Sequence, residues 1–190
     1  MSPPEIDSTA YRHVMGHFPT GVTIITAIDP ADESPVGLAA SSFTSVSMDP
    51  PLVLFCAGNF SSSWPRIQRA GHFCVNIVGA DHEWISRQFS SKAADKFANV
   101  EWRPEVSGAP VLNDAHAWID CQVHEEIAAG DHVIVVGRVL ALGAAEAGGP
   151  LAYYRGAYGQ FTAIPSTAPV APTAPTAPTA PVAPASPAVS

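Results

Sequence analysis

The stretch that decides the fold runs from Gly21 to Ile28 and reads Gly-Val-Thr-Ile-Ile-Thr-Ala-Ile. β-Branched side chains at this density suit the pleated, half-buried surface of a strand. Similar runs follow along the chain, at Val36–Phe43, Leu52–Ala57, Phe73–Val78, 117–124 and His132–Leu142. Apolar and polar residues alternate over 117–124, which predicts a strand with one buried face. His132–Leu142 is predicted to be the longest and most apolar strand.

Helical patterns are fewer and lie between these strands. Asp7 or Ser8 can cap a helix that runs to about Phe18. Ser62 or Ser63 can cap a second helix, which begins at 64–66 and ends near residue 71 with the usual proline just inside the start and glycine past the end. We expect a third helix over 81–89 and a short fourth helix over 93–99.

The order of these elements lacks the regular alternation of strands and helices found in a doubly wound α/β sheet. Many short strands joined by tight turns are typical of closed antiparallel architectures. The sequence therefore predicts a mainly β fold, a largely antiparallel β-barrel with peripheral helices.

All the charge lies in the first 164 residues. The 190-residue chain has nine basic and 17 acidic side chains, a formal net charge of −8, and none of these residues lies in 165–190. That segment contains only Pro, Ala, Thr, Val and Ser, which offer too little bulky apolar surface to offset the entropy of ordering. We predict one folded domain over 1–164 and a disordered, extended tail over 165–190.

The acidic balance and the apolar pattern exclude two classes of partner. With nine basic residues in the whole chain, no stripe of positive charge is available to neutralise nucleic-acid phosphates. No apolar run approaches the length of a membrane-spanning helix, and the N-terminus has no signal-peptide pattern. We therefore expect a soluble, cytoplasmic protein.

The cysteines and histidines do not form a metal-binding pattern. Cys56, Cys74 and Cys121 are odd in number, widely spaced and surrounded by apolar residues, which favours buried, inert thiols over disulfides or a zinc cluster. His13 and His17 share a helix face but lack the third ligand of a zinc site. No Walker loop and no Gly-x-Gly-x-x-Gly fingerprint occurs.

Two segments gather hydroxyl and small side chains where strands are predicted to end. Asn59 and Ser61–Ser63 lie between a strand and a helix, where hydroxyls and free backbone N–H groups can bind an anion. Simple capping of the helix by serine is the alternative. Thr20 and the run Ala39, Ala40, Ser41 and Ser42 would let a flat ring approach the backbone, although a tight corner of the barrel also needs small residues.

One histidine stands out by its position. Gly130 and Asp131 form a turn that leads into the last long strand, so His132 would lie at a strand end. Its ordinary pKa lets an imidazole donate a hydrogen bond or a proton at physiological pH. A turn histidine bonded to a nearby carbonyl is the alternative.

Taken in order, these motifs resemble the short-chain flavin reductases, the reductase components of two-component flavin-dependent monooxygenases. The similarity covers about Tyr11 to Tyr158. The matching stretches are Phe18–Thr26, Gly37–Ser47, Pro50–Phe55, Phe73–Ile77, Gly130–His132 with Gly137, and Tyr153–Tyr158. Many relatives place a basic residue in the segment that matches 57–63, whereas this chain has none there and the next one along the chain is Arg66.

The resemblance implies an FMN-binding split barrel that works as a homodimer, with the flavin at the subunit interface. Thr20 and Ala39–Ser42 would line the isoalloxazine and ribityl chain. The residues implied at the flavin phosphate are Asn59, Ser61, Ser62, Ser63, Ser90 and Lys96. His132 and Tyr158 would face the nicotinamide.

Two hypotheses follow. The first is an NADH-dependent reductase that transfers hydride to FAD or FMN and supplies diffusible reduced flavin to a separate monooxygenase. We favour NADH because the sequence shows no evident cluster of Arg and Lys for a 2′-phosphate. The second is a split-barrel flavin-binding protein with another oxidoreductase activity or with a non-catalytic role.

Overall fold

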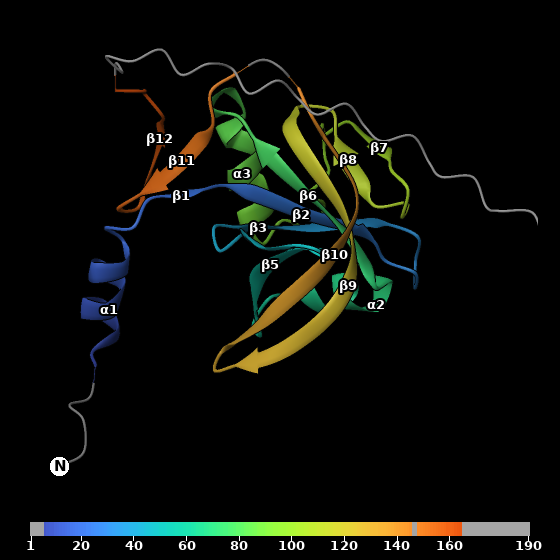
Figure 1. Cartoon of the computed structure of the whole chain (residues 1–190), viewed down its shortest axis with the longest axis horizontal. Coiled ribbons are helices and arrows are strands. Elements are labelled where there is room, and N and C mark those ends of the chain that lie inside the picture. The colour runs from blue at the N-terminus through green and yellow to red at the C-terminus, as the bar shows by residue number, and fades with distance from the viewer. Residues whose placement is uncertain (1–5, 146–147, 165–190) are drawn as a thin grey trace, which may run out of the picture.

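A computed structural model describes residues 6–145 and 148–164, and the predicted tail at 165–190 lies outside them. The main sheet has seven antiparallel strands in the order β3-β2-β6-β9-β10-β5-β4 (Figure 1). Their bounds are β2 Thr23–Ile28, β3 Pro35–Ala40, β4 Thr44–Met48, β5 Pro51–Gly58, β6 His72–Val78, β9 Ala115–Ala129 and β10 His132–Ala144. β9, at 15 residues, is longer than the 13-residue β10, so the prediction that the strand beginning at His132 is the longest was wrong.

The mainly β, antiparallel prediction is confirmed, and the sheet curves around one core. Leu38 from β3 and Phe55 from β5 belong to the same buried cluster, although four strands separate β3 from β5 in the sheet. Phe55 packs edge-on against both Phe73 and Trp64. No pairing joins the edge strands β3 and β4 within the described residues, so closure of the barrel remains a prediction.

Three helices form where the sequence predicted them. They are α1 (Ser8–Met15), α2 (Trp64–Ala70) and α3 (Glu83–Ser90), the last preceded by a short 3₁₀ turn, η1 (Ala80–His82). The Asp7 carboxylate caps α1 by accepting from the Ala10 N–H at 3.0 Å. α2 ends at Gly71, whose left-handed φ of 68° suits glycine.

The fourth predicted helix, over 93–99, is wrong because local side-chain bonds satisfy its backbone in another way. The Ser91 hydroxyl accepts from the Ala93 N–H, and the Asp95 carboxylate accepts from the Phe97 N–H. The Gln88 side chain donates to the carbonyls of Lys96 and Ala98. Such contacts compete with helical hydrogen bonds, so the segment runs as an irregular loop along α3.

Two small sheets complete the structure. β1 (Thr20–Gly21) pairs with β11 (Leu151–Tyr154), which pairs with β12 (Ala157–Gln160). β7 (Trp102–Pro104) pairs with β8 (Pro110–Leu112). The buried Asn76 of β6 ties β8 to the main sheet, since its amide donates to the Pro110 carbonyl and accepts from the Leu112 N–H at 2.8 Å.

The loop before β8 also changes the predicted burial of 117–124. Asp120 was placed on the polar face of that strand, yet it is fully buried. Its carboxylate accepts from the Ser107 N–H at 2.8 Å and from the Ser107 hydroxyl at 2.5 Å. At this point β9 is therefore covered on both faces.

Candidate functional site

A large cavity, of about 590 Å³, lies where β3 and β5 meet the end of α3 and the loop after it. A cavity of this size falls in the range that small-molecule sites use. Nine of the residues predicted for the site line it, namely Ala39, Ala40, Ser41, Ser42, Ser61, Ser62, Ser90, Lys96 and His132. Residues that sequence reasoning missed also line it, among them Cys56, Phe60 and Lys92. The six segments that supply these residues are far apart in sequence, so the fold alone assembles the cavity.

One wall of the cavity consists of small side chains at the end of β3. The Ser42 hydroxyl accepts from the Cys56 N–H at 2.8 Å and so connects this wall to β5. Ala39, Ala40 and Ser41 leave room for a flat ring to approach the backbone. Thr20 lies instead on β1, opposite Tyr153, and lines neither this cavity nor the two beside it.

Lys96 holds three segments of the cavity wall together. Its ammonium donates to the Phe89 carbonyl at 2.9 Å, to the Ser63 hydroxyl at 3.3 Å and to the Gly37 carbonyl at 3.4 Å. Partial burial lowers the pKa of this ammonium because the charged form loses hydration. Lys96 forms no ion pair within the described residues, so its positive charge is available to an anion.

The serines predicted at the start of α2 take two different roles. Ser63 is the N-cap residue but makes no side-chain capping bond, and it is nearly buried under Lys96. The Ser61 hydroxyl accepts from the Trp64 N–H at 3.2 Å and therefore caps the helix. Asn59 does not line the cavity, because its side chain donates to the Gly130 carbonyl at 3.3 Å and fixes the turn before β10.

A second cavity, of about 300 Å³, shares Ser62, Lys92 and Lys96 with the first. Beyond this shared wall it is lined by Ser63 and Arg66 from α2 and its cap, by 35–37 from β3 and by 93–94 from the loop after α3. Lys92 and Lys96 are the chain's two lysines. Arg66, Lys92 and Lys96 therefore line one cavity in the folded chain. We favoured NADH because the sequence shows no evident cluster of Arg and Lys, and this cavity removes that reason.

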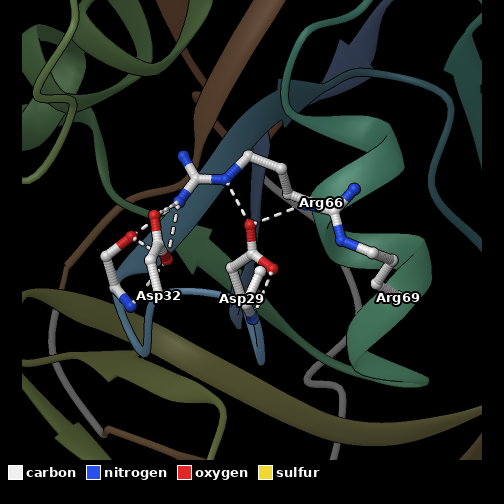
Figure 2. Close-up of polar contacts among 6 residues, drawn as sticks. Asp29, Asp32, Arg66 and Arg69 are labelled. Atoms are coloured by element: carbon white, nitrogen blue, oxygen red, sulfur yellow. Dashed lines mark hydrogen bonds and ion pairs between the residues drawn. The ribbon is translucent and has the colours of Figure 1, made fainter.

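Arg66 belongs to an ion-pair network that anchors α2 to the β2–β3 turn (Figure 2). Its Nε donates to the Asp29 carboxylate at 2.6 Å and one terminal nitrogen donates to Asp32 at 3.2 Å, while Arg69 donates to Asp29 at 2.8 Å. Only 2% of the Asp29 side chain is exposed. The bond from Arg66 lowers the pKa of Asp29 to about 2, so this carboxylate is charged at neutral pH.

His132 begins β10 and lines the large cavity with a fixed ring orientation. Its Nδ1 lies 2.8 Å from the Asp131 carboxylate, and its ring meets Phe60 edge-on at 5.8 Å between centroids. The same contact lowers the pKa of Asp131. When Asp131 accepts from Nδ1–H, the Nε2 atom is left to accept a hydrogen bond in neutral imidazole or to donate one in imidazolium.

Tyr158 lies in a third cavity, of about 240 Å³, which shares Ala39, Ala40, Ser41 and Ser90 with the large one. Its hydroxyl is 2.9 Å from the Ser86 hydroxyl, and the Arg87 guanidinium lies 4.9 Å from its ring centroid. The sequence placed Tyr158 and His132 together on the nicotinamide side. In the described residues they line separate cavities, both of which include Ala39–Ser41.

The thiols differ from one another in exposure. Cys74 and Cys121 are buried as predicted, and burial raises the pKa of both, that of Cys121 to about 12. Cys56 was predicted to be buried, but it is only half-buried and lines the large cavity.

Over 6–145 and 148–164, no group of three or more His, Cys, Asp and Glu side chains is arranged to hold a metal ion. No helix in that part of the chain has the length and apolar character needed to cross a membrane.

Comparisons with known proteins agree on one family. The flavin reductase like domain matches residues 15–162. A flavin reductase of Pseudomonas putida is 45% identical over 159 residues, which cover 84% of this chain and 93% of that protein. The reductase subunit HsaB of a flavin-dependent monooxygenase of Mycobacterium tuberculosis is 43% identical over 156 residues, covering 81% and 82% of the two chains.

A solved structure shows the same fold. The NADH:FAD oxidoreductase SgcE6 of Streptomyces globisporus, in complex with NAD and FAD fragments, superposes with a TM-score of 0.77 at 35% identity. The match covers 82% of this chain and 93% of that one.

Proposed function

The chain belongs to the flavin reductase-like domain family and is an NAD(P)H:flavin oxidoreductase, and on that premise we propose that it reduces FAD or FMN with NADH for a separate monooxygenase. The observation that carries the proposal is the 590 Å³ cavity, which joins a wall of small residues to a wall of hydroxyls and two lysines that form no ion pair with a described residue. Small residues suit a flat ring system, and lysines suit a phosphate as point charges.

The protein's contribution to this reaction is mainly positioning. When flavin and nicotinamide are bound, hydride passes directly between their rings, which requires that the rings stack in contact. We assign Ala39–Ser42 to the ring and ribityl part of the flavin, with Thr20 at the edge of that region. We assign Ser61, Ser62, Ser90 and Lys96 to the phosphate, and Ser63 a supporting role there because its hydroxyl accepts from the Lys96 ammonium. Asn59 is assigned a supporting role, since it fixes the turn that carries His132.

His132 is proposed to act on the nicotinamide side by donating a hydrogen bond or a proton from Nε2. Its Nδ1 contact with Asp131 orients the ring toward this task. We expect His132→Ala to lower turnover or to raise KM for the nicotinamide while flavin binding persists. Loss of flavin binding alone would show that His132 contacts the flavin and not the nicotinamide.

Tyr158→Phe tests the second residue proposed on the nicotinamide side in the same assay, because this change removes the hydroxyl that lies against the Ser86 hydroxyl.

Activity is tested by following nicotinamide absorbance with each flavin and each nicotinamide in turn. The proposal predicts loss of absorbance with NADH at saturating FAD or FMN, and a higher kcat/KM for NADH than for NADPH. Support for NADH comes from the similarity to SgcE6, which is an NADH:FAD oxidoreductase. No absorbance change with either nicotinamide at flavin saturation would refute the reductase assignment.

A homodimer is part of the proposal. α1 has no buried residue, and apolar side chains on and after it stand exposed, including Val14 at 66% and Phe18 at 69%. In Figure 1 this helix projects away from the main sheet. A second copy of the chain would cover this surface, and sedimentation equilibrium should give twice the chain mass. A monomer at micromolar concentration would contradict this part.

A further inference from the structure

The second cavity, beside the proposed flavin site, has a composition that flavin mononucleotide does not explain. The chain contains two lysines, and both line the wall that this cavity shares with the large one. Arg66 also lines the second cavity. Among the described residues that line the second cavity, none is acidic, although acidic residues outnumber basic ones 17 to nine in the chain.

The positive charge in this cavity comes mainly from the lysines. Arg66 is largely compensated, because it pairs with Asp29 and Asp32 (Figure 2), and neither carboxylate lines the cavity. Lys92 and Lys96 form no ion pair with any described residue. Asp95 lies between them in sequence, but its carboxylate accepts from the Phe97 N–H and does not line the cavity. Two uncompensated cations in one concave wall attract more than one phosphate charge.

Position decides which phosphate the second cavity can take. Ser61 and Ser62 line the large cavity together with both lysines. Ser62 and the two lysines also line the second cavity, to which Ser63 and Arg66 contribute as well. A second phosphate joined directly to the first would therefore enter it. Flavin adenine dinucleotide carries such a phosphate, and flavin mononucleotide does not.

We propose that the second cavity binds the adenylate phosphate of FAD, so that this reductase selects FAD over FMN. The inference rests on the proposed function and adds the flavin that the enzyme uses. Lys92 and Lys96 contact both phosphates in this arrangement, and the part of the cavity near Ala93 and Ala94 receives the adenylate group.

The test places a carboxylate where the second phosphate would lie. Ala94 is exposed and lines the second cavity but not the first. Ala94→Glu introduces a negative charge, and Ala94→Gln is the matched control with the same shape and no charge. Dissociation constants for FAD, FMN and riboflavin are measured from flavin fluorescence at low salt.

We expect the unsubstituted protein to bind FAD at least about tenfold more tightly than FMN. In Ala94→Glu, Kd for FAD should rise roughly tenfold more than Kd for FMN, because like charges placed side by side cost binding energy. Ala94→Gln adds the same bulk without the charge and so measures the effect of size alone, and the ratio of Kd for FAD to Kd for FMN should be roughly tenfold higher in Ala94→Glu than in Ala94→Gln. Lys92→Gln should weaken FAD and FMN and leave riboflavin, which has no phosphate, close to its original Kd.

Three results would overturn the inference. Equal affinity for FAD and FMN in the unsubstituted protein is the first, and an equal loss of both in Ala94→Glu is the second. The third is a rise in KM for NADPH in Ala94→Glu without any change in Kd for FAD, which would assign the cavity to a nicotinamide 2′-phosphate. In all three the protein still binds and reduces flavin, so these results differ from failure of the proposed function, in which neither flavin is reduced.

Discussion

Replacing Gly37 with alanine tests how closely β3 approaches α3 beside the proposed site. A Cβ at Gly37 would lie 2.5 and 2.8 Å from two ring carbons of Phe89 and 3.0 Å from the Ile25 carbonyl oxygen. Carbon atoms normally approach to about 3.5–4.0 Å, so the ring must retreat by roughly 1 Å. Phe89 is only 1% exposed and packs edge-on against Phe97, so little space is available for this movement.

Such overpacking costs about 1–3 kcal/mol of unfolding free energy. In a domain of this size each kcal/mol lowers Tm by about 2–4 °C, so Gly37→Ala should melt roughly 2–12 °C lower. Urea unfolding followed by tryptophan fluorescence measures the change, because Trp64 is 4% exposed in the native core. Gly21→Ala is the matched control, since its Cβ would meet nothing within 4 Å, and it should leave stability within about 1 kcal/mol.

A double-mutant cycle makes the reasoning refutable. Phe89→Leu removes the atoms that the new methyl group strikes, so Gly37→Ala should cost less in that background, by about 0.5 kcal/mol or more. Strict additivity of the two changes would show that the Phe89 contact is not the cause. Equal losses in Gly37→Ala and Gly21→Ala would show that backbone preference outweighs the contact.

Three other expectations follow from the buried polar groups and the thiols. Asn76→Ala should lower the unfolding free energy by about 1–3 kcal/mol in urea titration, because the Leu112 N–H loses its buried acceptor; an unchanged midpoint would refute this. The low pKa of Asp29 stabilises the fold above about pH 4, and this contribution is lost as pH falls toward 2. Asp29→Asn should therefore lower Tm at neutral pH and flatten the Tm profile between pH 4 and 2, whereas parallel profiles would contradict the assignment. A thiol reagent should modify Cys56 before the other two cysteines in the native protein, and saturating FAD should slow the modification of Cys56. Labelling of Cys121 at the same rate would contradict the burial of Cys121.

Local patterns predicted six of the seven strands of the main sheet and the three helices, because these elements depend on neighbours in the chain, but β4, β7, β8, β11 and β12 were not predicted. The β-branched run at 21–28 and the proline and glycine that flank α2 determine their conformations within a few residues. The helix expected over 93–99 failed because Gln88, Ser91 and Asp95 offer its backbone other partners. Helical propensity alone carries no information about such partners.

The composition of the candidate site was predictable only in part. The small and hydroxyl residues at 39–42 and 61–63 were identified because they form continuous segments. Lys92 and Arg66 were not linked to each other, since 26 positions separate them in sequence and only the folded chain brings both to one cavity. Asn59 and Ser63 were assigned to a ligand, yet in the structure their side chains bond to other parts of the protein.

The three acceptors that Lys96 joins come from β3, from the cap of α2 and from the end of α3. In the unfolded chain these groups are apart, so a ligand held there binds only the native state and shifts the folding equilibrium toward it. At a free concentration 100 times Kd, that linkage adds about 2.7 kcal/mol to the unfolding free energy. Under the proposed function the enzyme releases its flavin to a partner and so gives up this contribution in every catalytic cycle. Its resistance to heat and to proteases should therefore rise and fall with the cellular supply of free flavin.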